Sequence, residues 1–183
     1  MQVQAKEQES YEVLSSTFGY TNKMQAPTIE KVVVSVGVGK VRNDKNKMDV
    51  IEDRLAKITG QHAAQVAAKK SIAQFKVRAG DVAGYKTTLS GQRAYDMLDK
   101  LIHVALPRTK DFRGINRTSV DEMGNLTIGI KEHTIFPETG DEDIRDVFGL
   151  AVTVVSSVGN QDEAMAFFEH LGVPFKKLEA SNE

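Results

Sequence analysis

The amino-acid sequence predicts a single α+β domain over residues 1–183, with a mixed, largely antiparallel sheet, helices packed on one face and the other face open. Its length, with 40% hydrophobic and 27% charged residues, is ordinary for one folded domain with a core. Apolar residues recur at helical spacing in some segments and alternate in others, which indicates both helices and strands. These segments follow no regular strand–helix–strand order, so a doubly wound parallel sheet is not expected.

Four segments have the apolar periodicity of helices, namely residues 5–18, 44–58, 92–106 and 162–171. The first accounts for most of an N-terminal helical region at 1–19. The third has the clearest amphipathic pattern, and we expect Pro107 to end it. Gly60 and Gly172 follow the second and fourth helices, where a left-handed glycine commonly terminates a helix.

Five segments read as strands, namely residues 29–39, 65–67, 85–91, 126–131 and 150–157. In three of them apolar residues alternate with short, hydroxyl or basic ones, so the second face lacks bulk. Its residues are Ser35, Gly37 and Gly39, then Lys86, Thr88 and Ser90, then Thr127, Gly129 and Lys131. Such a face fits the shallow minor groove of RNA, although a plainly solvated sheet face is the alternative.

Positive charge is concentrated in the middle third of the chain. Residues 60–118 carry 11 Lys and Arg against 4 Asp and Glu, residues 119–183 carry 4 against 13, and the net charge is −1. Clustered Lys and Arg attract phosphate and release counterions when they bind it, so this pattern indicates an anionic partner. A solvated basic face would show the same charge count.

Several classes of function lack the residues that they need. The chain has no cysteine, which excludes disulfides, thiolate metal sites and cysteine nucleophiles. The four histidines have no metal-ligand spacing, and neither a metal nor a cofactor is expected. No apolar run reaches the roughly 18 residues of a membrane span, and the first residues lack the apolar segment of a secretory signal. We therefore expect a cytoplasmic protein without a membrane partner.

Catalysis is not expected either, and no small-molecule substrate is indicated. Residues 37–40 (GVGK) lack the four-residue gap of a phosphate-binding loop and are followed by Val41 where Ser or Thr would bind magnesium. The acidic run at 138–146 does not match a calcium-binding loop, and we expect a solvated loop or a patch for a basic partner. We expect His103 on a helix surface and His133 in loop packing, with a weak RNA contact as the alternative for His133.

Seven short motifs, in order, carry a resemblance to a known family over about residues 20–177. They are VVSVGVG (Val33–Gly39), ITGQ (58–61), AKKSIAQF (68–75), KTTLSG (86–91), ALPRTKDFRG (105–114), GIKEHTIFP (129–137) and VPFK (173–176). Each motif alone is weak, but their joint occurrence in one order is specific. The chain resembles the family of large-subunit ribosomal protein five, the 5S rRNA-binding protein of the central protuberance.

This resemblance implies three contact regions. The sheet face and adjoining positions would bind 5S rRNA through Ser35, Gly37, Gln61, Lys69, Lys86, Thr88, Ser90 and Arg93. A protruding basic loop at 69–84 would contact the peptidyl-site tRNA through Lys70, Ser71, Phe75, Lys76 and Arg78. An intersubunit bridge would use Arg108, Lys110, Arg113, Asp143 and Asp146. Residues 178–183 would form a short tail.

The partners implied by the resemblance are 5S rRNA, 23S rRNA, peptidyl-site tRNA, a protein of the small-subunit head and other central-protuberance proteins. Two features depart from the family pattern. Ser90 stands where an arginine is common, which removes one phosphate contact, and the sequence pI of about 6.4 is low for a basic family. A free-standing RNA chaperone or regulatory RNA-binding protein is the alternative function, because it would share the basic middle third.

Overall fold

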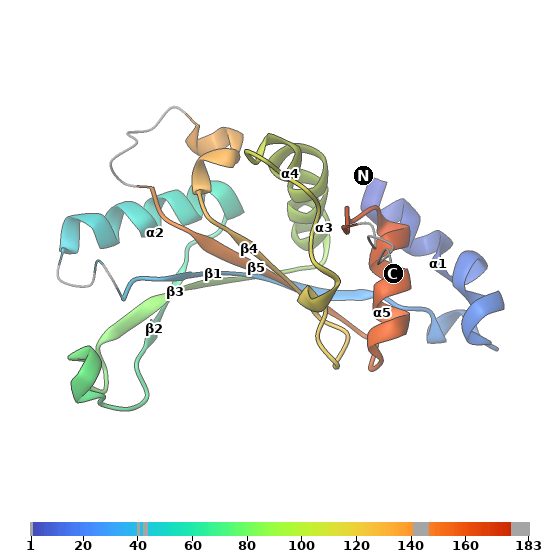
Figure 1. The fold of residues 1–183 in the computed structure, drawn as a ribbon, viewed down its shortest axis with the longest axis horizontal. Helices are drawn as coiled ribbons and strands as arrows, with labels where there is room; N and C mark the ends of the chain where they lie inside the picture. Colours follow the sequence, from blue (N-terminus) through green and yellow to red (C-terminus); the bar gives the residue numbers. More distant parts are fainter. Residues whose placement is uncertain (1, 40, 42–43, 141–146, 177–183) are drawn as a thin grey trace, which may run out of the picture. The chain divides into compact units, whose positions relative to one another are not determined.

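The computed structural model describes residues 2–39, 41, 44–140 and 147–176. Over these residues the chain forms an antiparallel five-stranded sheet with the strand order β2-β3-β1-β5-β4 (Figure 1). The strands are β1 (Ile29–Gly37), β2 (Ala64–Ala67), β3 (Val82–Ser90), β4 (Leu126–Ile130) and β5 (Leu150–Ser156). The helices are α1 (Gln2–Phe18), α2 (Lys45–Thr59), α3 (Gln92–Lys100), α4 (Leu106–Arg108) and α5 (Gln161–Leu171). The predicted α+β class is confirmed.

The chain divides into two compact units. The first unit comprises residues 1–32, 90–128 and 153–183, and the second comprises residues 33–89 and 129–152. Strands β1, β3, β4 and β5 each contribute residues to both units. The prediction of one domain over residues 1–183 stays a prediction.

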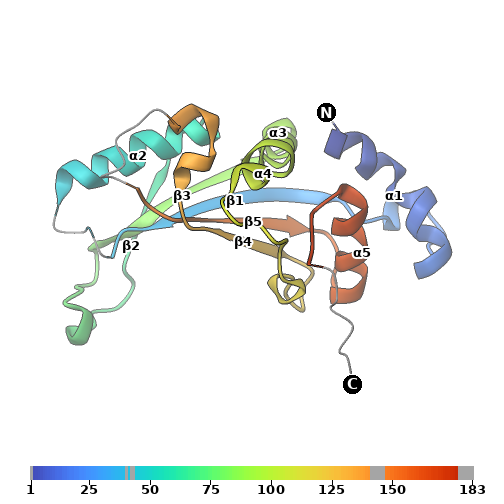
Figure 2. The same cartoon turned by 45° about the horizontal axis from the view of Figure 1, so that its top comes forward.

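The core of the second unit lies between α2 and the strands. Figure 2 shows α2 along one face of the part of the sheet formed by β1 and β3. Leu55 and Ile58 of α2 and Val34 and Tyr85 of the strands are at most 2% exposed. Burial raises the pKa of Tyr85, and the carboxylates of Glu52 and Asp49 in α2 raise it further. Because α2 takes this face of the strands, their side chains on the opposite face are left outside the core.

Helix α2 is bounded as its sequence predicts. The side chain of Asp44 accepts a hydrogen bond from the amide of Lys47, which caps the first turn. Gly60 has φ = 67° and donates its amide to the carbonyl oxygen of Ala56, which ends the helix. The predicted helix at 44–58 therefore lies within one residue of the observed one.

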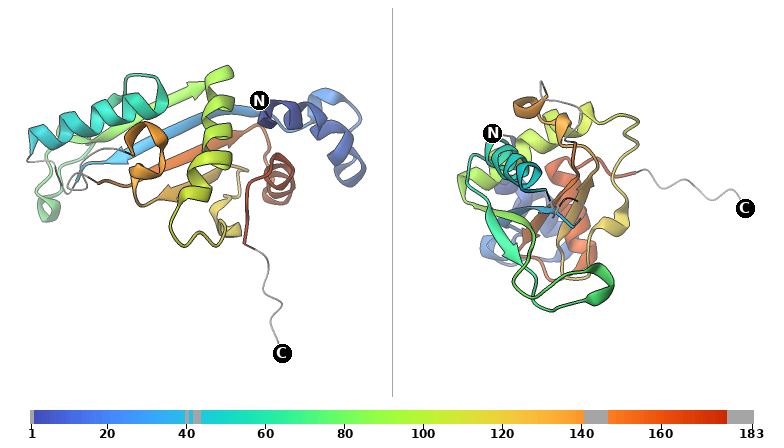
Figure 3. Two further views of the ribbon diagram at one scale, coloured as in Figure 1. Left: turned by 90° about the horizontal axis from the view of Figure 1, so that it is seen from above. Right: turned by 90° about the vertical axis from the view of Figure 1, so that its left-hand side faces the viewer.

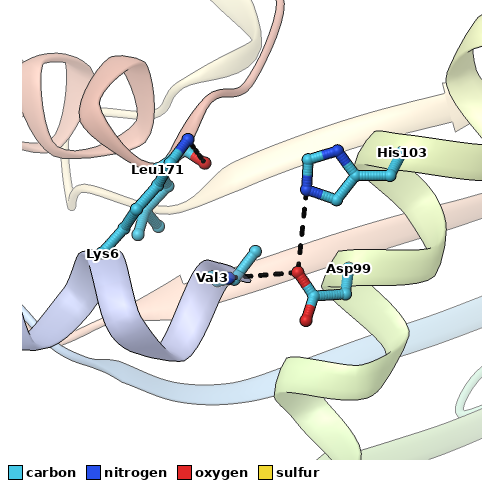
Figure 4. A network of polar contacts seen from close by, with 5 residues as sticks. All are labelled: Val3, Lys6, Asp99, His103 and Leu171. Carbon is cyan, nitrogen blue, oxygen red and sulfur yellow. Dashed lines mark hydrogen bonds and ion pairs between the residues drawn. The ribbon is translucent and has the colours of Figure 1, made fainter. Parts of the chain in front are cut away.

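The first unit is held together largely by helices. Helix α1 packs against α3 and α5. The buried side chains of this unit include Val3 and Leu14 of α1 and Phe167 and Phe168 of α5. Figure 4 shows how the N-terminus of α1 meets α3: the amide of Val3 donates to Oδ1 of Asp99 over 3.0 Å. The sequence pattern places Asp99 on the solvent side of its helix. In the structure Asp99 is instead half-buried, because its carboxylate accepts a hydrogen bond from an amide in the first turn of α1 that has no partner within the helix.

The predicted helix at 92–106 continues beyond its expected end. Residues 101–105 form a π turn, in which the amide of Leu106 donates to the carbonyl oxygen of Leu101, and α4 then runs through Pro107 to Arg108. The prediction that Pro107 ends the helix is wrong. The π turn shifts the hydrogen-bonded carbonyls by one residue, which lets the chain accept a proline there without leaving the helical path.

Candidate nucleic-acid interface

The second unit has an uncovered sheet surface built from small and basic residues, which we call the open face: Ser35 and Gly37 of β1 with Lys86 and Thr88 of β3. All four are half-buried or exposed, whereas their neighbours along the strands, Val34, Val36, Tyr85, Thr87 and Leu89, are buried. The strict alternation follows from the pleat of the strands. The predicted bare face is therefore present in the second unit, on the side opposite α2.

Strands β1 and β3 are neighbours in the sheet, so their exposed residues form one surface. The amide of Val38 donates to the carbonyl oxygen of Ala83 over 3.1 Å, which sets an antiparallel register that places Ser35 beside Lys86. The short hydroxyl and the long cation thus lie together. Such a pair can offer one hydrogen-bonding group and one charge to a ribose-phosphate chain.

Two glycines of these strands have different reasons to be there. A Cβ atom on Gly84 would lie 2.4 Å from the carbonyl oxygen of Val36, so the close approach of β1 requires glycine at this position. A Cβ atom on Gly37 would meet nothing within 4 Å, and its φ is not positive. The protein's own fold therefore does not require glycine at position 37. An external partner that approaches the strand closely would require a residue without a side chain there.

Gln61 lies beside the open face, because the turn at Gly60 directs the chain from α2 back to the sheet. Its Nε2 donates to the carbonyl oxygen of Thr88 over 3.3 Å. The structure thus brings two of the predicted RNA-binding residues into direct contact. Ser90 and Arg93 follow Thr88 in the chain but belong to the first unit, where both are exposed.

Residues 68–81 form an ordered extension of the β2–β3 hairpin, which we call the arm. Its two sides are joined by backbone hydrogen bonds at both ends. Near the sheet the amide of Ala68 donates to the carbonyl oxygen of Asp81 over 2.8 Å, and near the tip the amide of Ile72 donates to the carbonyl oxygen of Val77 over 2.9 Å. The right-hand view of Figure 3 shows this green segment projecting beyond β2 and β3. The predicted loop at 69–84 extends too far, since β3 begins at Val82. Pairing of Ala67 with Val82 extends the strand.

Most side chains of the arm face solvent. Phe75 is 67% exposed and Ile72 is 47% exposed, which is unusual for large apolar residues and leaves them available to a partner. Lys69, Lys70 and Arg78 are exposed, and among the residues that the structure describes their side chains have no ion-pair partner. The arm thus combines free cations with an exposed aromatic ring.

Two predicted tRNA-contacting residues have structural roles in the arm. The hydroxyl oxygen of Ser71 accepts a hydrogen bond from the amide of Ala79 over 2.9 Å and so ties the two sides together. Lys76 has φ = 52° and ends the tip turn, with its amide bonded to the carbonyl oxygen of Ala73. The sequence does not reveal either role, because each depends on the hairpin register.

The predicted bridge residues are only partly described. Arg108, Lys110 and Arg113 lie in the first unit and are exposed, whereas Asp143 and Asp146 lie outside the described residues. The structure adds Lys176 to this region, since its amide donates to the carbonyl oxygen of Ile115 over 2.9 Å. Sequence reasoning missed the pairing of Lys176 with Ile115, two residues after Arg113. The only signal was its place in the VPFK motif.

The expectation that His133 serves in packing is confirmed. Its ring is fully buried, stacks on Phe148 with centroids 4.2 Å apart and lies 3.3 Å from Nη1 of Arg54. His103 is exposed on its helix, as predicted, with Nε2 3.8 Å from Oδ1 of Asp99. Within the described ranges no group of three metal-ligating side chains occurs, and no helix is both long and apolar enough to cross a bilayer.

Known proteins resemble the chain over most of its length. The profile of the family described as "Ribosomal protein L5" matches residues 22–78, and the profile of the C-terminal region of the same ribosomal protein family matches residues 82–175. Proteins named "Large ribosomal subunit protein uL5" from Mycoplasma mycoides, Flavobacterium johnsoniae and Lacticaseibacillus casei are 44%, 45% and 46% identical over 164 residues. These alignments cover 90% of this chain and 91%, 90% and 91% of the relatives.

The two profiles together span most of the described residues, and the relatives match over almost their full lengths. The predicted family and the predicted absence of enzymatic activity are therefore correct. The predicted location in the large ribosomal subunit is confirmed as well. The chain belongs to the ribosomal protein L5 family, whose members are RNA-binding, non-enzymatic proteins of the large ribosomal subunit.

Proposed function

We propose that the chain binds 5S rRNA in the large subunit through the open face, with Gln61, Lys69, Ser90 and Arg93 as further contacts. Gly37 carries this proposal. Gly37 is exposed on β1, and a Cβ atom there would meet nothing within 4 Å, so the missing Cβ favours close approach of an RNA backbone. Lys86 supplies charge beside it, and Ser35 and Thr88 supply hydroxyls for 2′-hydroxyl and phosphate oxygens.

The arm is proposed to contact the tRNA in the peptidyl site. Lys70, Lys76 and Arg78 would bind phosphates of the tRNA backbone. Phe75 would pack on a ribose or an unstacked base, as exposed aromatic rings do in single-stranded RNA sites. The backbone hydrogen bonds of the arm support this role, because they hold the cations on a defined scaffold rather than on a coil.

A third contact is proposed with the head of the small subunit. Arg108, Lys110 and Arg113 provide its positive part, and the acidic run that contains Asp143 and Asp146 provides its negative part. A basic protein of the small-subunit head suits the acidic run by charge complementarity. Further partners in this proposal are 23S rRNA and other central-protuberance proteins.

The central experiment is a gel-shift titration of 5S rRNA with the purified chain at several salt concentrations, with an unrelated structured RNA of equal length as the control. If about five phosphate contacts form, the logarithm of the affinity should fall with the logarithm of the salt concentration with a slope of about −4.5. Equal affinity for the two RNAs at every salt concentration would contradict specific 5S rRNA binding.

Sedimentation separates a ribosomal constituent from a free-standing RNA chaperone. A constituent should be found almost entirely in large-subunit fractions, in equal amount to other large-subunit proteins. A chaperone should sediment free or be present in less than one copy per subunit. The second result would favour the alternative function for this chain.

A further inference from the structure

The turn that follows α2 is organised by the hydroxyl of Thr59. This hydroxyl oxygen lies 2.8 Å from the carbonyl oxygen of Leu55, one helical turn back, and 3.0 Å from the carbonyl oxygen of Gln61. It also accepts a hydrogen bond from the amide of Gln61 over 3.4 Å. A hydroxyl has one proton and two lone pairs, so it donates to one of the two carbonyl oxygens at a time and accepts from the amide. One side chain thus holds both backbone polar groups of Gln61.

Packing around Gly60 does not fix this turn. Gly60 is exposed, and a Cβ atom there would meet nothing within 4 Å. Glycine adopts left-handed and right-handed backbone conformations almost equally well, so it permits the turn without enforcing it. Thr59 is only 9% exposed, and its side chain is therefore held in place by its surroundings. The hydroxyl of Thr59 is thus a fixed point from which the path of the next two residues is set.

The turn delivers the side chain of Gln61 to the open face. Strand β2 begins at Ala64, which pairs with Lys86, so Thr88 lies two residues beyond the last pairing of β3 with β2. Nε2 of Gln61 donates to the carbonyl oxygen of Thr88 over 3.3 Å at this point. The carboxamide of Gln61 therefore continues the pairing of β3 past the end of β2 and holds the Thr88 end of the open face.

We propose that Thr59 is a positioning residue for the RNA-binding surface of the second unit. Its hydroxyl is buried in the turn and acts through Gln61, which in turn contacts Thr88. The inference rests on the proposed function and deepens it, because it adds a residue that shapes the open face without contacting RNA. The hydroxyl is uncharged, so its loss should lower the affinity for 5S rRNA without removing a phosphate contact.

The test compares two substitutions by gel shift with 5S rRNA at several salt concentrations. Thr59→Val replaces the hydroxyl with a methyl group of similar size, and we expect the affinity to fall about fivefold with an unchanged log–log salt slope. Lys86→Ala should instead make the slope shallower by about 0.9, because it removes one charge. Thr59→Ser keeps the hydroxyl and should bind within about twofold of the unmodified chain.

Thr139→Val is the matched control for loss of stability. Thr139 is fully buried in the same unit, and its hydroxyl donates to the carbonyl oxygen of His133 over 3.0 Å. Both valine variants should lower the urea midpoint, since each removes a buried hydrogen bond. Only Thr59→Val should lower the affinity for 5S rRNA.

A double-mutant cycle shows whether Thr59 acts through Gln61. If it does, Thr59→Val should cause no further loss of affinity in a chain that already carries Gln61→Ala. Losses that add in full would mean that the two side chains act separately. Should Thr59→Val fail to fold, Thr59→Ala, which adds no bulk, takes its place in both comparisons.

Three results would overturn the proposal: 5S rRNA affinity unchanged by Thr59→Val, an equal loss of affinity in Thr139→Val, or fully additive losses in the cycle. Failure of the unmodified chain to bind 5S rRNA would instead contradict the proposed function. The side-chain amide of Gln61 then provides the measurement, because its NMR signal in the free chain should move in Thr59→Val and not in Thr139→Val. A signal that Thr59→Val does not move rejects the positioning role without reference to RNA.

Discussion

The arm and the open face are both exposed surfaces of the second unit, yet they are built in opposite ways. The open face has short side chains, and the same strands send Val34, Val36 and Tyr85 into the core on their other side. The arm has long basic and aromatic side chains, and from Lys69 to Phe75 none of its residues is buried. One surface is backed by a packed layer, whereas the other is held by its own hairpin hydrogen bonds.

This difference predicts how the two surfaces bind RNA. A core-backed strand cannot move aside, so the size of a side chain decides how closely an RNA backbone approaches it. An arm without a core contributes little to global stability and binds through charge and stacking. Each substitution in the arm should therefore remove only the phosphate or stacking contact of that side chain. A single large side chain added to the open face should instead keep the RNA backbone away from the strands and so remove several contacts at once.

The largest effect is expected from Gly37→Leu. The new side chain would hold an RNA backbone away from β1, and we expect 5S rRNA affinity to fall on the order of 100-fold, or about 2.7 kcal/mol. The fold should survive, because a Cβ at this position meets nothing within 4 Å. Gel shift measures the affinity, and urea unfolding measures stability. Gly84→Ala is the contrasting control, and it should destabilise the fold because its Cβ would lie 2.4 Å from the Val36 carbonyl oxygen.

A smaller effect is expected when Lys70, Lys76 and Arg78 are all replaced by alanine, namely a decrease in tRNA affinity on the order of tenfold. Affinity for tRNA should fall and its salt slope should become shallower by about 2 to 3, because three phosphate contacts are removed. Binding of 5S rRNA should be largely retained, because the open face is intact. Loss of 5S rRNA binding without any change in tRNA binding would reverse the division of roles between the two surfaces.

Ser90→Arg should increase 5S rRNA affinity severalfold. It adds a cation at a position where the family resemblance implies arginine, and one added phosphate contact should steepen the salt slope by about 0.9. Salt-dependent gel shift with 5S rRNA checks this. Ser90→Gln adds length without charge, so an equal gain from both variants would show that charge at this position is not the cause.

The smallest effect concerns stability, at a site outside both surfaces. Burial raises the pKa of Glu7, although hydrogen bonds from the hydroxyl of Tyr95 (2.8 Å) and the amide of Ile29 (3.2 Å) oppose the shift. A carboxyl with a raised folded-state pKa binds its proton more tightly when folded. Its contribution to the free energy of unfolding is therefore greatest below the unfolded pKa and is lost as the pH rises through the folded-state pKa.

Replacing Glu7 with glutamine should remove this part of the pH dependence of the free energy of unfolding. Urea unfolding from about pH 4 to about pH 8 measures it. RNA binding at neutral pH should not change. A pH profile identical to that of the unmodified chain would show that Glu7 is not the titrating group.

Individual elements show where local sequence sufficed. Helix α2 was predicted within one residue because its cap Asp44, its apolar stripe and Gly60 all lie in one short window. The bare side of β1 and β3 was predicted because the period of a strand is two, whatever lies around it. The continuation of the helix through Pro107 was not predictable, since it depends on a π turn that no local propensity marks.

By itself, the sequence determined the class of fold, the alternation that keeps bulk off one side of the strands, and the family, because these follow from short-range periodicity and ordered motifs. The tertiary structure alone decided that α2 takes the apolar side of β1 and β3. It also decided that Asp99 accepts a hydrogen bond from the first turn of α1 and that the Lys176 amide pairs with the Ile115 carbonyl oxygen. Burial of apolar surface forces backbone groups that are distant in sequence to find hydrogen-bond partners. Which groups meet depends on the fold of the whole chain, so the local sequence does not predict these contacts.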